Sequence, residues 1–135
     1  MSGGELLPIA VYGTLRPGGR AWHAFGLDRR THHLGPCRIA GRILDLGGYP
    51  GLVEGDGLVA GDLLQPLDTA LAAELDAYEG EGYARVIVTL PDPAGMAAQL
   101  WRWEGSIAGA RAVPGDDWLH CRATEIDPTD GDAAA

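Results

Sequence analysis

The residues of this chain that could do chemistry fall in two short segments. The first is Tyr12–Arg16 (YGTLR), at the end of a short apolar run. Gly13 lets the backbone turn and come close to a ligand, and successive N–H groups in such a turn can form a concave site for an anion. Taken alone, however, this segment is also typical of an ordinary turn between a strand and a loop, which is the simpler interpretation.

The second segment is Leu75–Gly80 (LDAYEG), which ends the best predicted helix. The negative end of a helix raises the pKa of a nearby carboxyl group, and packing against aromatic residues raises that pKa further by desolvation. A Glu tuned in this way is a suitable proton shuttle near neutral pH, so Glu79 is the candidate acid/base. The competing interpretation, a solvated Glu at a helix end, is favoured by position alone. Asp76 could share the face of Glu79, whereas Glu81 lies beyond the helix and is expected in solvent.

Other residue types offer weaker candidates. The four histidines form no HxH or HExxH pattern, so surface histidines are expected and no metal site: His23, His32, His33 and His120. No Ser stands in a GxSxG sequence, and without lysine the chain has no P-loop motif. Trp101 and Trp103 could line a pocket, but packing in the core is the simpler account.

The helix that carries Glu79 is predicted over residues 68–79. Asp68 is a plausible N-cap, and Gly80 stands where a left-handed residue ends a helix. The apolar positions recur at helical spacing: Leu71, Leu75 and Tyr78.

Along the sequence, predicted strands precede and follow this helix. They are expected over residues 8–13, 34–46, 57–65, 83–90 and 97–103, with one or two helical turns over 21–28 and a loop over 47–51. A bend is expected at Gly41. Segment 83–90 alternates between two faces, and segment 97–103, with Gln99, Trp101 and Trp103 on one face, is its expected partner strand in a hairpin.

Length and composition fit one β-rich domain. The chain has 135 residues, and its 21 glycines are about twice the usual ~7% share. Several strands with one good helix predict an α+β fold, a small mixed and partly closed β-barrel flanked by short helices. We expect a flexible leader over residues 1–7, a domain over 8–124 and an acidic, disordered tail over 125–135.

The net charge of the chain limits the classes of ligand and partner that we expect. The net charge is −9 and no basic stripe is visible, so nucleic-acid binding is not expected. Such a field repels anionic substrates, so an anion site must be built locally, from backbone N–H groups or a placed Arg. There is no signal peptide and no apolar stretch of membrane-spanning length, which predicts a cytoplasmic protein without a membrane partner. Cys37 and Cys121 are expected to be free thiols, and the default assembly is a monomer.

Four segments together resemble one known family. They are Tyr12–Arg16 (YGTLR), Leu44–Val53 (LDLGGYPGLV), Leu75–Gly80 followed by Tyr83 and Arg85, and Gly115–Trp118 (GDDW). Each is modest on its own, but all four occur in the order found in the gamma-glutamylcyclotransferase-like family, including its gamma-glutamylamine cyclotransferase and AIG2-like branches. The resemblance covers roughly residues 9–119, and it overturns the simpler interpretations of the first two segments.

The resemblance implies a compact barrel in which the turn and Glu79 face one cavity. It implies that Tyr12, Gly13, Thr14 and Leu15 bind a gamma-glutamyl group, largely through main-chain N–H groups, and that Tyr83 lies near the pocket. It also implies an enzyme that cyclises this group to 5-oxoproline and releases a free amine, with Glu79 as acid/base and no metal or cofactor.

One departure from the family concerns the amine that leaves. Where relatives often read YVY, this chain reads Trp101-Arg102-Trp103, which changes the shape and polarity expected beside the leaving group. An alternative function is a non-catalytic small-molecule binding or interaction domain on the same fold, because a fold does not fix a function. A third is removal of a gamma-glutamyl protecting group from a metabolic intermediate by the same chemistry.

Overall fold

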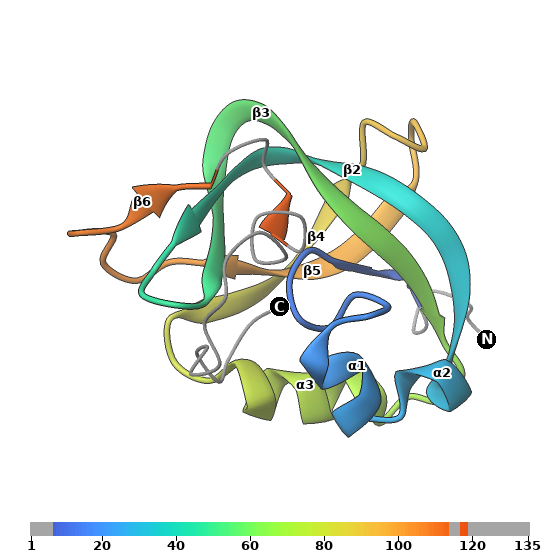
Figure 1. Ribbon diagram of the computed structural model, residues 1–135. Coiled ribbons are helices and arrows are strands. Elements are labelled where there is room, and N and C mark those ends of the chain that lie inside the picture. The colour runs from blue at the N-terminus through green and yellow to red at the C-terminus, as the bar shows by residue number, and fades with distance from the viewer. Residues whose placement is uncertain (1–6, 114–116, 119–135) are drawn as a thin grey trace.

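A single mixed sheet, curved into a half-barrel, forms the body of the protein (Figure 1). The computed structural model describes residues 7–113, 117 and 118. The strands are β1 (Ile9–Val11), β2 (Thr31–Asp45), β3 (Pro50–Pro66), β4 (Tyr83–Thr89), β5 (Ala97–Trp103) and β6 (Arg111–Ala112), and the helices are α1 (Arg20–Ala24), α2 (Leu27–Arg30) and α3 (Leu71–Glu79). The sheet order is β4-β5-β1-β3-β2-β6, and the three helices gather on one side of the curved sheet. The predicted α+β half-closed barrel with short flanking helices is confirmed.

The long hairpin of β2 and β3 gives the sheet its curvature. Its register moves from Arg42 opposite Val53 to Ala40 opposite Leu58, so residues 54–57 bulge opposite Gly41. Gly41 has a φ of 140°, and a Cβ there would lie 2.6 Å from the carbonyl oxygen of Val53. The bend predicted at Gly41 is therefore confirmed, and its cause is the close approach of the two backbones.

The strand boundaries in this hairpin were predicted too short. β2 starts at Thr31 and not at residue 34, and β3 starts at Pro50 and not at residue 57. The polar, glycine-rich residues 54–57 resemble a strand end in the sequence, but pairing with β2 resumes on their far side. The expected loop over 47–51 therefore overlaps the start of β3.

Helix α3 begins later than expected. Asp68 is not the N-cap, because the helix starts at Leu71 and the N-cap position is Ala70. The Asp68 side chain instead accepts hydrogen bonds from the amides of Ala70 (2.9 Å) and Leu71 (3.0 Å), which fixes the entry to the helix. Gly80, with a φ of 77°, ends the helix as predicted.

Strand β1 brings the first candidate segment to the middle of the molecule. It lies between β3, antiparallel to it, and β5, parallel to it, and all its residues are fully buried. The predicted hairpin of β4 and β5 is confirmed, with Tyr83 opposite Trp103 at one end and Thr89 opposite Ala97 at the other. The turn after β1 therefore leaves from the centre of the sheet.

The remaining predictions concern the first helical turns and the two ends of the chain. Segment 21–28, predicted to hold one or two helical turns, contains most of α1 and the first half of α2. The leader residues 1–6 and the tail over 125–135 lie outside the described residues, so the domain boundaries stay predictions. Of the helices in the described ranges, none has the length and apolar character that crossing a membrane requires.

Candidate active site

Tyr12 anchors the turn that follows β1. Its side chain is fully buried, and its hydroxyl donates a hydrogen bond of 2.6 Å to the carbonyl oxygen of Trp101. The Tyr12 hydroxyl oxygen also accepts a hydrogen bond of 3.3 Å from the amide of Leu52. Tyr12 thus ties the start of the turn to β5 and to β3.

The turn itself is shaped by its carbonyl groups. The amide of Arg16 donates to Gly13 O at 3.0 Å, and Thr14 O accepts from the amides of Ala21 (3.0 Å) and Trp22 (3.2 Å), which lie in the first turn of α1. Gly19 lies so close that a Cβ there would be 2.2 Å from Thr14 O. The Thr14 carbonyl therefore points toward α1, whereas the Gly13 carbonyl closes the turn on Arg16.

This arrangement leaves amide donors in the turn. Over the described ranges, no backbone carbonyl accepts a hydrogen bond from the amide of Gly13 or of Leu15. The Thr14 hydroxyl lies 3.5 Å from the hydroxyl of Tyr78, the residue before Glu79. The turn and the end of α3 are therefore neighbours, and the amides can serve an anion.

Glu79 is buried at the end of α3. Its exposed fraction is 3%, and it shares the buried face of the helix with Leu71 and Leu75. Neither carboxylate oxygen has a hydrogen-bond partner among the residues that the structure describes. Burial and, to a smaller extent, the negative charge of Asp76 together raise the pKa of Glu79 to about 8. A buried polar group without a partner is costly, so functional sites are the usual place to find one.

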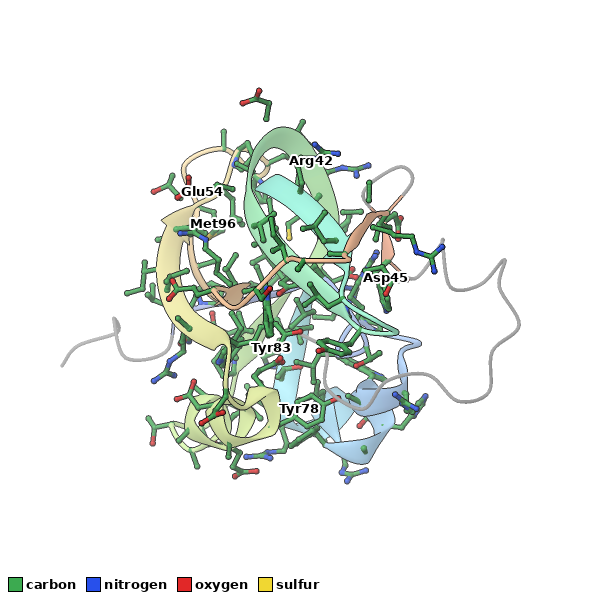
Figure 2. All side chains as sticks on the ribbon, turned by 90° about the vertical axis from the view of Figure 1, so that its left-hand side faces the viewer. Arg42, Asp45, Glu54, Tyr78, Tyr83 and Met96 are labelled. Carbon is green, nitrogen blue, oxygen red and sulfur yellow. The ribbon has the colours of Figure 1, made fainter. Side chains whose placement is uncertain are left out.

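Two tyrosines lie in the electrostatic environment of Glu79. Burial raises the pKa of Tyr12 and of Tyr83, and the charge of Glu79 raises both further. The Tyr83 hydroxyl donates a hydrogen bond of 2.6 Å to Pro50 O, so both phenols are committed to backbone carbonyls. Tyr83, from β4, and Tyr78, from α3, lie near one another between the strands and the helices (Figure 2). Because the phenols of Tyr12 and Tyr83 stay protonated at neutral pH, Glu79 is the group among these three that changes protonation near pH 8.

Asp76 is held in place one helical turn before Glu79. Its Oδ1 accepts a hydrogen bond of 2.8 Å from Trp101 Nε1, and its Oδ2 lies 3.3 Å from Arg85 Nη2. Both partners come from the β4–β5 hairpin, so the hairpin fixes the charge that acts on Glu79. The candidate tryptophan Trp101 is a core residue, 1% exposed.

An aromatic cluster continues outward from Tyr83. The Tyr83 and Trp103 rings meet edge to face at a centroid distance of 5.0 Å, and Tyr49 and Trp103 meet in the same way at 6.3 Å. Glycines pack against the indole of Trp103: a Cβ on Gly82 would lie 2.4 Å from it, and one on Gly105 2.5 Å. Substitution at either glycine would move Trp103, so its position is set by the backbone around it.

The structure thus brings most of the sequence-predicted residues together. Tyr12, Tyr83 and Glu79 form one cluster, the turn Gly13–Leu15 adjoins it, and the competitor Glu81 is exposed. Within the described residues there is no group of three or more His, Cys, Asp or Glu that could hold a metal ion. His120 and Cys121 lie outside those residues, and Cys37 is a buried free thiol.

An open cavity of about 600 Å³ is lined by Ala40, Glu54, Gly55, Asp56 and Arg102. Glu54 lies toward the top of the molecule in Figure 2, and Tyr78 lies at the bottom. We place the candidate site at Glu79 because a buried, unpartnered carboxyl is chemically unusual, whereas this cavity is an open surface hollow.

Fold and site together define a small half-barrel protein with a buried carboxylic acid beside a glycine turn. Comparison with known proteins gives the family. The family model for "Gamma-glutamyl cyclotransferase, AIG2-like" matches residues 9–120, and the chain belongs to this family. Membership indicates an enzyme of the cyclotransferase type.

Individual relatives agree with this assignment. The chain is 33% identical over 120 residues to the gamma-glutamylcyclotransferase family protein YtfP of Escherichia coli K12, covering 82% of this chain and 95% of the relative. The solution NMR structure of ytfP from E. coli has a TM-score of 0.61 at 31% identity, with 84% and 96% of the two chains covered. The crystal structure of the uncharacterized protein PH0828 from Pyrococcus horikoshii has a TM-score of 0.69 at 28% identity, covering 87% and 93%.

Proposed function

We propose that this protein cyclises the gamma-glutamyl group of a gamma-glutamyl amine or amino acid to 5-oxoproline and releases the free amine. The observation that carries the proposal is the buried carboxyl group of Glu79, which has no partner among the described residues and lies near the turn after β1. A substrate ammonium group is the kind of partner such a carboxyl lacks. The family assignment supports the same reaction class.

Glu79 would move one proton in each half of the reaction. The α-ammonium of the substrate gives a proton to the Glu79 carboxylate, and the resulting amine attacks the γ-carbonyl carbon to close a five-membered ring. Collapse of the tetrahedral intermediate breaks the bond from that carbon to the leaving nitrogen, which takes the proton back from Glu79. The ring nitrogen, which carries a positive charge after the attack, gives up its second proton, and that proton ends on the released amine, so the products are the neutral lactam and an ammonium ion. A pKa near 8 suits both directions, because the group gains and loses a proton with little cost near neutral pH.

The turn would bind the anionic parts of the substrate. The amides of Gly13 and Leu15 are donors without a backbone acceptor over the described ranges, and they suit the α-carboxylate or the developing oxyanion. Tyr12 and Tyr83 would shape the pocket and not transfer protons, since the pKa of each is raised and each hydroxyl already donates to a carbonyl. The reaction is intramolecular, so holding a folded conformer can contribute up to about 7–11 kcal/mol.

A single substitution tests the role of Glu79. Glu79→Gln should retain the fold and bind gamma-glutamyl amines, but 5-oxoproline detected by mass spectrometry should fall by at least about a hundredfold, the usual contribution of a general acid/base. Glu81→Gln removes the same charge from an exposed position and should keep full activity. Near-normal turnover by the Glu79→Gln variant would rule out this role. If the wild-type protein binds gamma-glutamyl amines without forming 5-oxoproline, the alternative function as a binding domain is favoured.

A further inference from the structure

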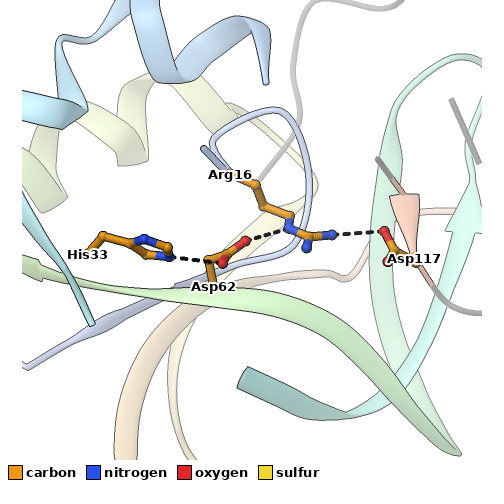
Figure 3. A network of polar contacts seen from close by, with 4 residues as sticks. All are labelled: Arg16, His33, Asp62 and Asp117. Carbon is orange, nitrogen blue, oxygen red and sulfur yellow. Dashed lines mark hydrogen bonds and ion pairs between the residues drawn. The ribbon is translucent and has the colours of Figure 1, made fainter. Parts of the chain in front are cut away.

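Arg16 ends the Tyr12–Arg16 segment, and its guanidinium is held on two sides (Figure 3). Its Nε lies 2.7 Å from Asp62 Oδ2, and its Nη1 lies 2.9 Å from Asp117 Oδ1. The side chains of Arg16 and Asp62 are only 14% and 12% exposed. Charge-assisted contacts of this length in a mostly buried position fix both partners.

Asp62 stands where it can hold both ends of the turn. It lies on β3 directly opposite Val11, the last residue of β1, and its carboxylate reaches Arg16 beyond the turn. Its other oxygen, Oδ1, lies 3.0 Å from Nε2 of His33 on β2. The carboxylate therefore joins β2 and β3 to the residue that follows the amides of Gly13 and Leu15.

The two carboxylates also offset the charge of Arg16. An arginine beside a glycine turn is the natural partner for a substrate carboxylate in a protein of net charge −9. However, the charges of Arg16, Asp62 and Asp117 sum to −1. A further carboxylate would be repelled by Asp62 and Asp117 as much as it is attracted by Arg16.

We propose that Arg16 and Asp62 are positioning residues: they hold the turn so that its main-chain amides, and not the guanidinium, bind the substrate carboxylate. This inference rests on the proposed function, because it assigns a role within that site. It predicts that loss of the Asp62 charge weakens substrate binding. The alternative, direct binding of the carboxylate by Arg16, predicts that the same substitution strengthens binding.

The test is the affinity of Asp62→Asn for gamma-glutamylalanine, measured by calorimetry in the full chain with Glu79→Gln present to prevent turnover. If Asp62 positions the turn, losing its charge should weaken binding at least about fivefold, the factor that corresponds to about 1 kcal/mol. If Arg16 binds the carboxylate itself, removing Asp62 frees its charge and binding should tighten. Asp56→Asn, which neutralises an exposed carboxylate, controls for the change in net charge.

A second variant covers the case in which Asp62→Asn does not fold. Asp117 is more exposed, 32%, so Asp117→Asn is the milder change, and its effect on affinity should have the same sign. Tighter or unchanged binding in these variants overturns the positioning role and leaves the proposed function standing. If the Glu79→Gln protein does not bind the probe and the wild type turns over no gamma-glutamyl amine, both proposals fall.

Discussion

Glu79 is affected by two influences that act in the same direction on its pKa. Burial is the larger and the charge of Asp76 the smaller, and together they bring the pKa to about 8. Since Glu79 must be ionised to accept a proton from the substrate, kcat/KM should rise with pH through an apparent pKa near this value. A profile of 5-oxoproline formation between pH 6 and 9 measures it, and a profile that is flat across this range would contradict the role.

Asp76 provides a way to shift that profile. Asp76→Asn removes the negative charge but leaves an oxygen that can still accept the hydrogen bond from Trp101. The pKa of Glu79 should fall, so the rising limb of kcat/KM should move to lower pH. Glu81→Gln removes a charge from an exposed residue and should leave the limb in place. A shift of equal size in both variants would show that net charge, and not the fixed position of Asp76, sets the pKa.

The same carboxyl group should make folding depend on pH. Its pKa is raised from 4.5 to about 8 in the folded protein, so the folded state binds more protons than the unfolded state between these values. Stability therefore falls as pH rises from about 4.5 to about 8, by an amount on the order of 4 kcal/mol. Glu79→Gln lacks this loss, so its Tm should equal that of the wild type near pH 4.5 and exceed it increasingly toward pH 9. A constant Tm difference between the two proteins would contradict the burial of an ionisable group here.

How far the site could be predicted from the sequence depends on whether its parts are local. The position of Glu79 before a helix-ending glycine is a local pattern, and so is the turn at Gly13. The partners of these residues are not local: Asp76 meets Trp101, and Arg16 meets Asp62, only after strands distant in sequence have paired. No fixed spacing in the sequence predicts which residues meet when distant strands pair. The sole sequence signal for Asp62 is a charged residue within an apolar strand, which is uncommon in a buried strand and marks a specific partner.

At the scale of elements, the fit between the turn and helix α1 can be tested. Gly19 has no room for a Cβ, because that atom would lie 2.2 Å from Thr14 O, whose position sets the direction of the turn. Gly19→Ala should therefore lower Tm and also raise KM for gamma-glutamyl substrates. Gly18→Ala is the control: a Cβ there meets nothing within 4 Å, although its φ of 90° carries strain of about 1–2 kcal/mol.

The two measurements separate the effects. Thermal unfolding should show a loss of stability in both variants, because one clashes and the other is strained. Steady-state kinetics should show a higher KM in Gly19→Ala alone. If both variants lose stability to the same extent and neither changes KM, the turn does not take part in substrate binding.

The elements predicted best were those with a clear period. Strand β4 alternates along most of its length, and the extent of the β4–β5 hairpin matched the prediction to within a residue. The β2–β3 hairpin was predicted in part, because a bulge interrupts its pattern and because the polar residues 54–57 face solvent where the strands arch away from the core. Asp68 shows the same limit: an Asx turn and an N-cap have the same residue type, and only the backbone geometry separates them.

At the scale of the whole molecule, the net charge of −9 makes substrate charge matter before any contact forms. The field reaches farther at low salt, since the screening length falls from about 30 Å at 0.01 M to about 8 Å at 0.15 M. Raising the salt over this range should lower KM for an anionic substrate such as gamma-glutamylglutamate and raise KM for a gamma-glutamyl diamine with a cationic tail, by a few-fold each. The control is gamma-glutamylmethylamide, which carries no net charge and should change little.

These opposite signs distinguish the field of the molecule from the local site. All three substrates present the same carboxylate to the turn, so any salt effect on that contact alone would move the three KM values together. If the three KM values change with salt according to the charge of the leaving group, and kcat does not change, the salt acts on the approach of the substrate to the protein. A common shift for all three would instead mean that an ionic contact within the site dominates, which would count against binding of the carboxylate by neutral amides and in favour of direct binding by Arg16.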